Sequence, residues 1–524
     1  MVAAARPPRP AVATGAARPR GITIGEEIRG DTVLDCDVVV VGSGAGGATI
    51  AAELAEAGWD VIVLEEGGYY STRDFTAEAS TMIRQLYRDG AATMAIGSPP
   101  ILYQEGRAVG GSTVINGGMS WRTPERVLDR WWRDAGIDHI RAADLEPYFE
   151  RVERRIHVAR QDPESVGRDN ALLKQGADAL GWKVLDNLRN QVHCPGSNNC
   201  AFGCPTGAKQ SALVSYVPRA LHFGARLYAD VRVARITRHG KRATGVVGRV
   251  VRPDGRPGPH LAVRAKLVVA ACGAIHTPAL LERSGVRVPS GRIGHNLSLH
   301  PNVKLVATFD QPVRGWEGVH QAYQVREFED EGLVFAAVNV PPSVVAMTSP
   351  VHGAALGAMM ADYDKMMVAG MLLEDTTTGQ VRTVGGRPQA FYQLSDFDAA
   401  KLIRGVGLLA ELLFEVGARE IMLPFEGVPA LTRPGDVRRL AGLRIPKETM
   451  EVVTVHMMGT AAMGRDRDRA VTDGWGRVHD AAGLVVADAS LFPTPIGVNP
   501  METIMALATR TAGFLIDHQG QVLA

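Results

Sequence analysis

The sequence predicts an α/β protein built on a doubly wound, Rossmann-type sheet, with an α+β part inserted into it. Three observations support this prediction. Residues 35–68 have the pattern of a strand, a helix and a second strand. Two more buried strands are expected at 265–274 and 482–490, and the long stretches between these pieces show amphipathic helical and alternating strand patterns instead. The sheet is therefore expected to assemble from segments that lie far apart in the chain.

Size and composition exclude several classes of protein. A chain of 524 residues is too long for one ordinary core, and 46% hydrophobic with 22% charged residues is a globular composition. The 57 basic and 56 acidic residues leave a net charge of +1, which gives no electrostatic reason to expect nucleic acid. No apolar run reaches the roughly 18 residues of a membrane-spanning helix. We therefore expect neither a nucleic-acid partner nor a transmembrane segment.

The first residues and the cysteines bear on cellular location. Residues 1–21 are rich in Ala, Pro and Arg, contain no acidic residue and lack the apolar core of a signal peptide, so we expect a disordered basic tail. Five cysteines are too few for a disulfide scaffold, and the odd count fits a reducing compartment. The sequence thus predicts a cytoplasmic protein, with membrane association left open.

The first strand, helix and strand carry a nucleotide-binding fingerprint. "DCDVVVVG" is a β-branched run that ends at Gly42, and "AGGATIAAELAEAG" is the helix that follows. Gly42, Gly44 and Gly47 spell G-x-G-x-x-G at their junction, where they permit a tight turn, close approach of a pyrophosphate and close helix packing. Glu65 lies 23 residues after Gly42 and is placed to bind a ribose diol, with Glu66 as the neighbouring candidate. The fingerprint by itself does not separate FAD from NAD.

Five segments in order make the chain resemble the glucose–methanol–choline (GMC) flavoprotein oxidoreductases. They are "GSGAGG" (42–47), "GRAVGGSTVINGG" (106–118), "ACGAIHTPALLERSG" (271–285), "VTVHMMGTAAMG" (453–464) and "GLVVADASLFPTPIGVNPMETIMALA" (483–508). The resemblance runs from about residue 35 to the end of the chain. It implies FAD as the cofactor and oxidation of an alcohol as the reaction.

The resemblance also implies which residues bind FAD and how the chain is divided. The FAD-binding candidates are Gly42, Ser43, Gly44, Gly47, Glu65, Gly110, Gly111, Ser112, Asn116, Val233 and Asp488. Some family members attach FAD through a His just before the Asn of the second segment. Ile115 stands there in this chain, which implies non-covalent FAD. The expected FAD-binding part comprises residues 33–120, 207–302 and 452–524, and the expected substrate-binding part and cap comprise 121–206 and 303–451.

Two residues are the catalytic candidates. His456 matches the family's catalytic His, and Asn499 occupies the position of the second catalytic residue. The resemblance implies transfer of a hydride from the carbinol carbon to flavin N5. The hydroxyl proton has to leave as well, and a His with an ordinary pKa near 6.5 suits the role of general base. We therefore expect His456 to be the base and Asn499 to hold the substrate oxygen.

The His and Asn pair resembles the cholesterol oxidase and long-chain alcohol oxidase branches, as does "CPTGAKQSALVSYVPRAL" (204–221). This implies a small hydrophobic alcohol as substrate, with a fatty alcohol favoured and a steroid alcohol as the alternative. The electron acceptor is oxygen or another acceptor, and peripheral membrane contact is left open. A lyase with non-redox FAD is the alternative from a different class.

Three cysteines form a separate cluster. Cys194, Cys200 and Cys204 are spaced C-x5-C-x3-C, which is one thiolate short of most zinc and iron–sulfur sites. The spacing nevertheless resembles a segment that binds a three-iron cluster in some FAD glucose dehydrogenases. Free or structural thiols are the favoured interpretation, and we assign no metal site.

Overall fold

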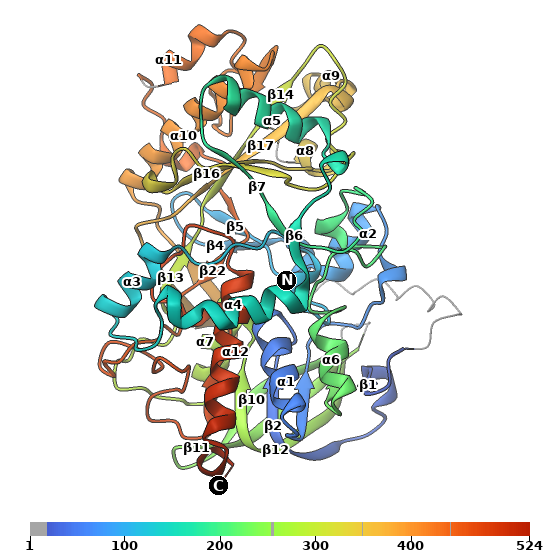
Figure 1. Cartoon of the computed structure of the whole chain (residues 1–524), viewed down its shortest axis with the longest axis vertical. Helices are drawn as coiled ribbons and strands as arrows, with labels where there is room; N and C mark the ends of the chain where they lie inside the picture. The colour runs from blue at the N-terminus through green and yellow to red at the C-terminus, as the bar shows by residue number, and fades with distance from the viewer. Residues whose placement is uncertain (1–17, 253–255, 348, 350, 441, 524) are drawn as a thin grey trace.

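The computed structural model describes residues 18–252, 256–347, 349, 351–440 and 442–523. Two large sheets dominate it, one in the lower half of Figure 1 and one in the upper half. Residues 1–17 of the expected tail lie outside the described residues. Gly21, the last residue of that tail, accepts a hydrogen bond from the backbone N–H of Leu227 (2.8 Å).

The lower sheet is the doubly wound sheet that the sequence predicts. Its eight strands, in spatial order, are β1 (Ile22–Thr23), β9 (Arg226–Tyr228), β3 (Val61–Leu64), β2 (Thr32–Val41), β12 (Pro257–Ala270), β11 (Arg242–Val251) and β10 (Val231–His239), with β23 (Leu484–Val486) beside β12. β12 is parallel to both β2 and β23, so the three separated segments do meet in one sheet. Val38, Val39 and Val40 are completely buried because both faces of the sheet are covered.

Helices cover this sheet. The helices nearest the sheet are α1 (Ala45–Glu56), α6 (Tyr216–His222), α7 (Gly273–Arg283) and α12 (Met501–Asp517), with α4 (Ala142–Ile156) outside α12. α1 packs against α12 and α6, and α12 also packs against α4. α12 thus lies against α1, the helix that follows the nucleotide fingerprint.

The upper sheet has nine strands. In spatial order they are β4 (Thr93–Ala95), β5 (Ile101–Tyr103), β21 (Val453–Thr454), β14 (Asn302–Thr308), β17 (Met366–Leu373), β16 (Leu333–Ala337), β15 (Tyr323–Val325) and β7 (Val184–Asp186), with β20 (Glu420–Met422) beside β14. α10 (Asp396–Glu415) packs against β17 and β14, and α5 (Arg168–Ala179) packs against α10. β4, β5 and β21 belong to this sheet although their residues fall within the segments expected to form the FAD-binding part.

Two smaller sheets and several short helices complete the described structure. The smaller sheets are β19 (Arg387–Phe391), β18 (Gly379–Val384), β13 (His295–Leu299) and β22 (Met457–Met458) in one, and β6 (Val158–Arg160) and β8 (Leu188–Asn190) in the other. The short helices are α2 (Ala79–Leu86), α3 (Glu125–Asp134), α8 (Pro342–Met347), α9 (Gly353–Ala361), α11 (Val437–Leu440) and α13 (Gln519–Val522). β13 of the four-stranded sheet is followed in the chain by β14 of the nine-stranded sheet.

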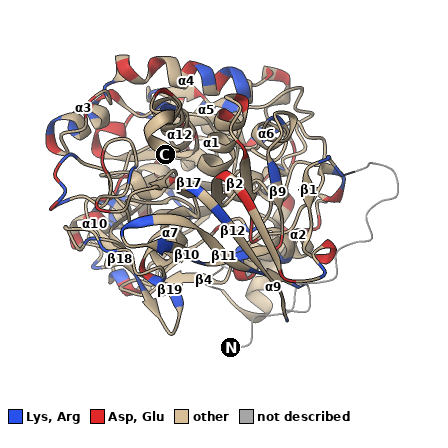
Figure 2. Cartoon of the chain, turned by 90° about the horizontal axis from the view of Figure 1, so that it is seen from below, with Lys and Arg blue, Asp and Glu red and all other residues tan. Residues whose placement is uncertain are grey.

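The distribution of charged and apolar residues is that of a globular protein. Acidic and basic residues are interspersed over the face shown in Figure 2. Met366, Met367 and Met371 are buried in β17, so these methionines pack in the core beside the nine-stranded sheet. Among the described residues, no helix combines the length and the apolar character needed to cross a bilayer.

Candidate active site

The turn between β2 and α1 requires glycine at two of the fingerprint positions. Gly42 has φ +103°, and a Cβ there would lie 2.3 Å from the carbonyl oxygen of Ala271. A Cβ on Gly47 would lie 2.0 Å from the carbonyl oxygen of Gly42. Both distances are far below van der Waals contact, so a side chain would force the helix away from the strand. These are the turn and packing roles that the sequence assigns to the two glycines.

Gly44, the remaining fingerprint glycine, faces the 106–118 loop. α1 begins after Gly44 with no side-chain cap, which leaves N–H groups of its first turn for a ligand. A Cβ on Gly111 would lie 2.7 Å from the Cα of Gly44, so the loop lies directly on the turn. The N–H of Gly110 donates to Oγ of Ser43 (3.0 Å) and fixes this contact. The arrangement fits a dinucleotide pyrophosphate, because backbone N–H groups at the helix start are free to bind an anion.

Glu65 is held at the end of β3. Its Oε2 accepts hydrogen bonds from N (3.0 Å) and Oγ (2.7 Å) of Ser43, and its Oε1 accepts one from N of Gly67 (2.7 Å). Burial raises the pKa of this carboxyl. The backbone oxygen of Glu65 accepts from the N–H of Val231, two residues before Val233 on β10. This hydrogen bond joins Glu65 to the strand that carries Val233, another of the FAD-binding candidates.

Glu66, the alternative ribose partner, is occupied by arginines. It pairs with Arg88 (3.3 Å), Arg107 (2.9 Å) and Arg232 (2.7 Å). Burial by itself would raise the pKa of Glu66, but these three charges hold it well below its ordinary value. Glu65 is therefore the better candidate for the ribose diol.

Asp488 lies under the start of α1. Its Oδ2 accepts from N of Gly273 (2.9 Å) and Oγ1 of Thr277 (2.5 Å), and its Oδ1 accepts from N of Ser490 (2.8 Å). A Cβ on Gly46 would lie 1.6 Å from the carbonyl oxygen before Asp488. The third and fifth family-like segments thus meet at the nucleotide turn.

The 106–118 loop reaches from the turn to the C-terminal helix. Oγ of Ser112 accepts from N of Gly106 (2.9 Å) and closes the loop on itself. Nδ2 of Asn116 lies 2.9 Å from Sδ of Met501, the first residue of α12. Ile115 is buried. One loop therefore connects the fingerprint glycines to the residues that follow Asn499.

The buried side chain of Lys209 donates hydrogen bonds to the backbone of this loop. Nζ of Lys209 donates to the carbonyl oxygens of Val114 (2.8 Å), Asn116 (2.7 Å) and Cys200 (2.6 Å). Burial lowers the pKa of Lys209 to about 8. The sequence analysis did not single out this residue, because nothing in its segment reveals that the ammonium is buried.

The three clustered cysteines lie next to Lys209. Cys200 and Cys204 are buried, Cys194 is partly exposed, and all three are free thiols. Sγ of Cys204 accepts from the backbone N–H of Lys209 (3.4 Å), and Sγ of Cys200 lies 3.7 Å from a guanidinium nitrogen of Arg189. Within the described ranges, no group of three or more His, Cys, Asp or Glu side chains is arranged to hold a metal ion.

The two catalytic candidates face each other. Nε2 of His456 and Nδ2 of Asn499 are 3.5 Å apart. Behind His456, Nδ1 of the fully buried His300 lies 3.0 Å from Nδ1 of His456. Nε2 of His300 accepts from the N–H of Gly497 (3.1 Å). Burial lowers the pKa of both rings, to about 3 for His300 and well below 6.5 for His456, where His300 adds to the effect.

Asn499 is hydrogen-bonded to a side chain of β15. Nε2 of Gln324 donates to Oδ1 of Asn499 (3.4 Å). The guanidinium of Arg326 donates twice to Oε1 of Gln324 (3.1 and 3.0 Å) and lies over the ring of Trp121 at 4.0 Å. Sequence reasoning did not find His300, Gln324 or Arg326, because none of them lies in a segment with a recognisable spacing.

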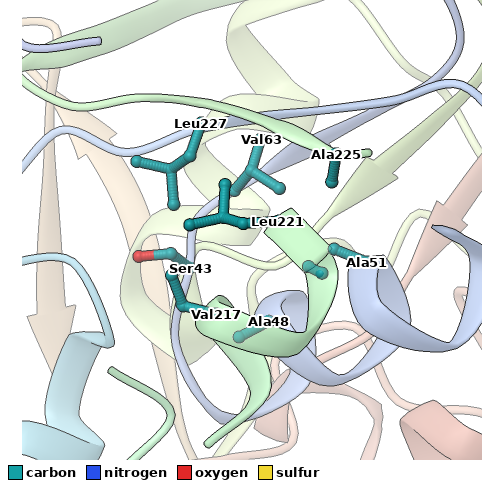
Figure 3. Close-up of a pocket in the computed structure, with 9 residues that line it drawn as sticks. Ser43, Ala48, Ala51, Val63, Val217, Leu221, Ala225 and Leu227 are labelled. Atoms are coloured by element: carbon teal, nitrogen blue, oxygen red, sulfur yellow. The ribbon is translucent and has the colours of Figure 1, made fainter. Parts of the chain in front are cut away.

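A small cavity lies beside α1 but is not a ligand site. It measures about 10 Å³, and apart from Ser43 its lining is aliphatic. Figure 3 shows Val217 and Leu221 of α6 facing Ala48 of α1 across it. This volume is no larger than one water molecule needs, so the cavity is a packing gap between the two helices.

Comparison with known proteins identifies the family. Residues 83–302 and 376–508 match the GMC oxidoreductase family, and residues 37–93 match the FAD binding domain. The uncharacterized GMC-type oxidoreductase y4nJ of Sinorhizobium fredii is 36% identical over 95% of this chain and 98% of its own length. The long-chain-alcohol oxidase FAO4B of Arabidopsis thaliana is 27% identical over 93% of this chain and 68% of its own length.

A solved structure shows the same fold. The crystal structure of pyridoxine 4-oxidase from Mesorbium loti superposes with a TM-score of 0.70 at 20% identity, over 91% of this chain and 99% of that chain. The fold, the FAD-binding match and the close relative agree with the site geometry. The chain belongs to the GMC oxidoreductase family and is an FAD-dependent alcohol oxidoreductase.

Proposed function

We propose that this enzyme oxidises the CH–OH group of a hydrophobic alcohol, with a long-chain primary alcohol as the first candidate. The observation that carries the proposal is the 3.5 Å approach of His456 and Asn499. Support for the substrate class comes from relatives named long-chain-alcohol oxidases, which are 25–27% identical over more than nine-tenths of this chain. Met366, Met367 and Met371 of β17 pack in the core and give no indication of the substrate.

FAD is proposed to bind without a covalent bond. The turn from Gly42 to Gly47 and the N–H groups that follow it suit the pyrophosphate, and Glu65 suits the ribose. The loop at Gly110 and Gly111 would continue along the cofactor. The buried hydrocarbon side chain of Ile115 offers no atom for a covalent link. When bound, FAD supplies the acceptor for the hydride.

The protein's part in the reaction is to hold the alcohol oxygen. A hydroxyl group placed between His456 and Asn499 would be oriented by both side chains, and such positioning contributes several kcal/mol to lowering a barrier. The role of general base for His456 stays a prediction, because it depends on which ring nitrogen carries the proton. The proposed substrate-binding part supplies Gln324 and Arg326 behind Asn499.

The test is anaerobic reduction of the yellow holoenzyme by a panel of alcohols. Aliphatic alcohols of increasing chain length, cholesterol, glucose and choline are compared by the rate at which the flavin absorbance bleaches. We expect long-chain alcohols to bleach it fastest, and peroxide to form when the experiment is repeated in air. Bleaching by glucose or choline alone would reject the hydrophobic substrate class. Cyanide release from mandelonitrile without bleaching by any alcohol would identify a lyase instead.

A pair of variants tests the site. His456→Ala removes one side of the proposed oxygen site and is expected to slow flavin reduction by at least a hundredfold. His518→Ala changes an exposed ring near the C-terminus and serves as the matched control. Normal flavin reduction in His456→Ala would exclude this residue from the reaction.

A further inference from the structure

Lys304 lies on the same face of the nine-stranded sheet as Gln324, the side chain that contacts Asn499. We propose that Lys304 binds a carboxylate at the far end of the substrate, so that the enzyme prefers an alcohol whose hydrocarbon chain ends in an acid. The proposal rests on the proposed alcohol oxidation and deepens it, because it names the second functional group of the substrate. Lys304 is thereby a binding residue that determines specificity.

The two faces of the sheet differ in what covers them. α10 packs against β14 and β17, and α5 packs against β15 and β16. Leu305 of β14 and Phe335 of β16 are completely buried in the core under these helices. Because successive side chains of a strand point to opposite faces, their neighbours Lys304 and Ala336 lie on the other face. Both of these residues are only partly buried.

Four residues of this second face form one row across neighbouring strands. In order they are Gln324 of β15, Ala336 of β16, Gly370 of β17 and Lys304 of β14. Ala336 pairs with Gly370, and Gly370 pairs with Lys304. The pairing of β15 with β16 one residue further along places Gln324 opposite Ala336. Three strand spacings therefore separate Gln324 from Lys304, which is about 14 Å.

The two middle positions of the row have the smallest side chains. A Cβ on Gly370 would meet no atom closer than the carbonyl oxygen of Val303 at 3.8 Å and Cγ of Lys304 at 3.9 Å, so there is room above this strand. The rows on either side carry larger apolar side chains, which are Val306, Val338 and Val368 in one row and Val334 and Leu372 in the other. Small residues between branched ones suit the close approach of a hydrocarbon chain along the row.

Lys304 is a charged group that lacks a counter-charge. Burial lowers the pKa of its ammonium. Within the described part of the chain, Nζ has neither a hydrogen-bond partner nor an ion-pair partner. Lysines that are taken out of water in proteins are usually paired, because an ammonium that loses hydration needs an anion to replace it. The single positive charge of Lys304 matches the single negative charge of a carboxylate.

The row therefore fits a molecule with two polar ends. A hydroxyl group held by His456 and Asn499 lies at the Gln324 end, and a carboxylate at Lys304 would lie at the other end. Lys304 also lies four residues beyond His300, the residue that contacts His456, which is about 13 Å of extended chain. Both routes give a similar separation, and a hydrocarbon chain spans it. The substrate class is thus a hydroxy acid with its two groups at opposite ends.

The direct test is calorimetric titration of the oxidised holoenzyme with a saturated fatty acid and with its methyl ester, below their micelle concentrations. Neither compound has a hydroxyl group, so binding is measured without oxidation. We expect the acid to bind at least tenfold more tightly than the ester. Lys304→Met should abolish this preference and Lys304→Arg should retain it. Lys241→Met is the matched control, since Lys241 is 73% exposed and pairs with Asp480.

Equal affinities for the acid and the ester in the wild-type enzyme would overturn the proposal. An unchanged preference for the acid in Lys304→Met would overturn it as well, because the carboxylate would then be bound elsewhere.

A second variant fills the row and leaves the charge in place. Ala336→Leu puts a branched side chain where the hydrocarbon chain is proposed to lie. We expect it to weaken the binding of the acid and of the ester alike, by at least tenfold. Ala355→Leu makes the same change at an exposed position of α9 and serves as the control. Normal affinities in Ala336→Leu would reject the proposed path of the chain.

Flavin reduction separates this proposal from the proposed function. We expect hydroxy acids to reduce the flavin with a kcat/KM at least tenfold above that of plain alcohols of equal length, and Lys304→Met to raise KM for the hydroxy acids only. Reduction by plain alcohols with no effect of Lys304→Met on either class would keep the proposed function and overturn the carboxylate site. Binding of the fatty acid that depends on Lys304, in an enzyme that neither class reduces, would reject the proposed function and keep the site.

Discussion

Replacement of Lys209 by Met tests whether the buried ammonium stabilises the 106–118 loop. The ammonium donates to the carbonyl oxygens of Val114, Asn116 and Cys200 at 2.6–2.8 Å. Met has a similar length and no donor, so Lys209→Met leaves these three buried acceptors without that partner. Each unsatisfied group costs about 1–3 kcal/mol. The change also removes a buried charge, which restores part of this loss.

The pKa of Lys209 indicates how much free energy of unfolding is regained when the buried charge is removed. Burial lowers the pKa of Lys209 from 10.5 to about 8, and a shift of that size corresponds to about 3 kcal/mol. The net loss expected for Lys209→Met is therefore about 3 kcal/mol in the free energy of unfolding. Because the loop joins the fingerprint turn to α12, the variant should also purify with less FAD.

Lys209 is also expected to make the stability of the wild-type protein depend on pH. Between pH 8 and about 10.4 the unfolded lysine binds more protons than the folded one, so this group makes the wild-type protein gain stability as the pH rises through that range. Lys209→Met lacks this gain, and the stability difference between the two proteins should widen from pH 8 to pH 10.

The assay is urea unfolding of both holoproteins at several pH values, together with the ratio of flavin to protein absorbance. Lys241→Met is the matched control, since Lys241 is 73% exposed and pairs with Asp480 on the surface at 3.0 Å. It should change stability by no more than about 0.5 kcal/mol. Unchanged stability, FAD content and pH slope in Lys209→Met would refute the account of the loop.

Three further substitutions have defined outcomes. Glu66→Gln removes the carboxylate shared by three arginines and should lower the free energy of unfolding by about 3 kcal/mol at pH 7, measured with urea. This loss should shrink below pH about 4, because the ion pairs that lower the pKa of Glu66 stabilise the fold only while the carboxyl is ionised. A loss that does not depend on pH would contradict this account. Gly47→Ala should yield protein without FAD, since its Cβ would lie 2.0 Å from the carbonyl oxygen of Gly42; a normal flavin content would show that the turn adapts. Burial raises the pKa of Asp375, which accepts from Tyr392 (2.7 Å), so the wild type loses stability as the pH rises from about 4 and Asp375→Asn should not; identical pH profiles in thermal unfolding would rule this out.

The doubly wound sheet was predictable because its signals are local. One short segment holds the β-branched run of β2, the glycines of the turn and the helix after them. At Gly42 and Gly47 a side chain would clash with backbone oxygens, which is the steric reason for glycine at these positions. The parallel pairing of β12 with β2 and β23 followed from the same buried-strand pattern in distant segments. Local pattern and global packing agree here, so the sequence sufficed.

The residues that contact the catalytic candidates could not be predicted, because these contacts join distant parts of the chain. His300 and His456 are 156 positions apart, and Gln324 and Asn499 are 175 apart. A buried His, Gln or Lys has no spacing that distinguishes it from a surface residue of the same type. The sequence also could not predict that Met367 and Met371 are buried in the core. An apolar strand residue has the same pattern whether it lines a substrate cavity or packs in a core.

The position of the two histidines explains why residues so far apart in the sequence meet at hydrogen-bond distance. His300 lies between β13 and β14, and His456 lies between β21 and β22. β13 pairs with β22 in the four-stranded sheet, and β14 pairs with β21 in the nine-stranded sheet. Each histidine therefore sits where its chain passes from one sheet to the other, and the ladders on both sides fix the two backbones against each other. A shift of one residue in either ladder would move one ring away from the other, so the 3.0 Å contact between the two rings depends on the register of these strands.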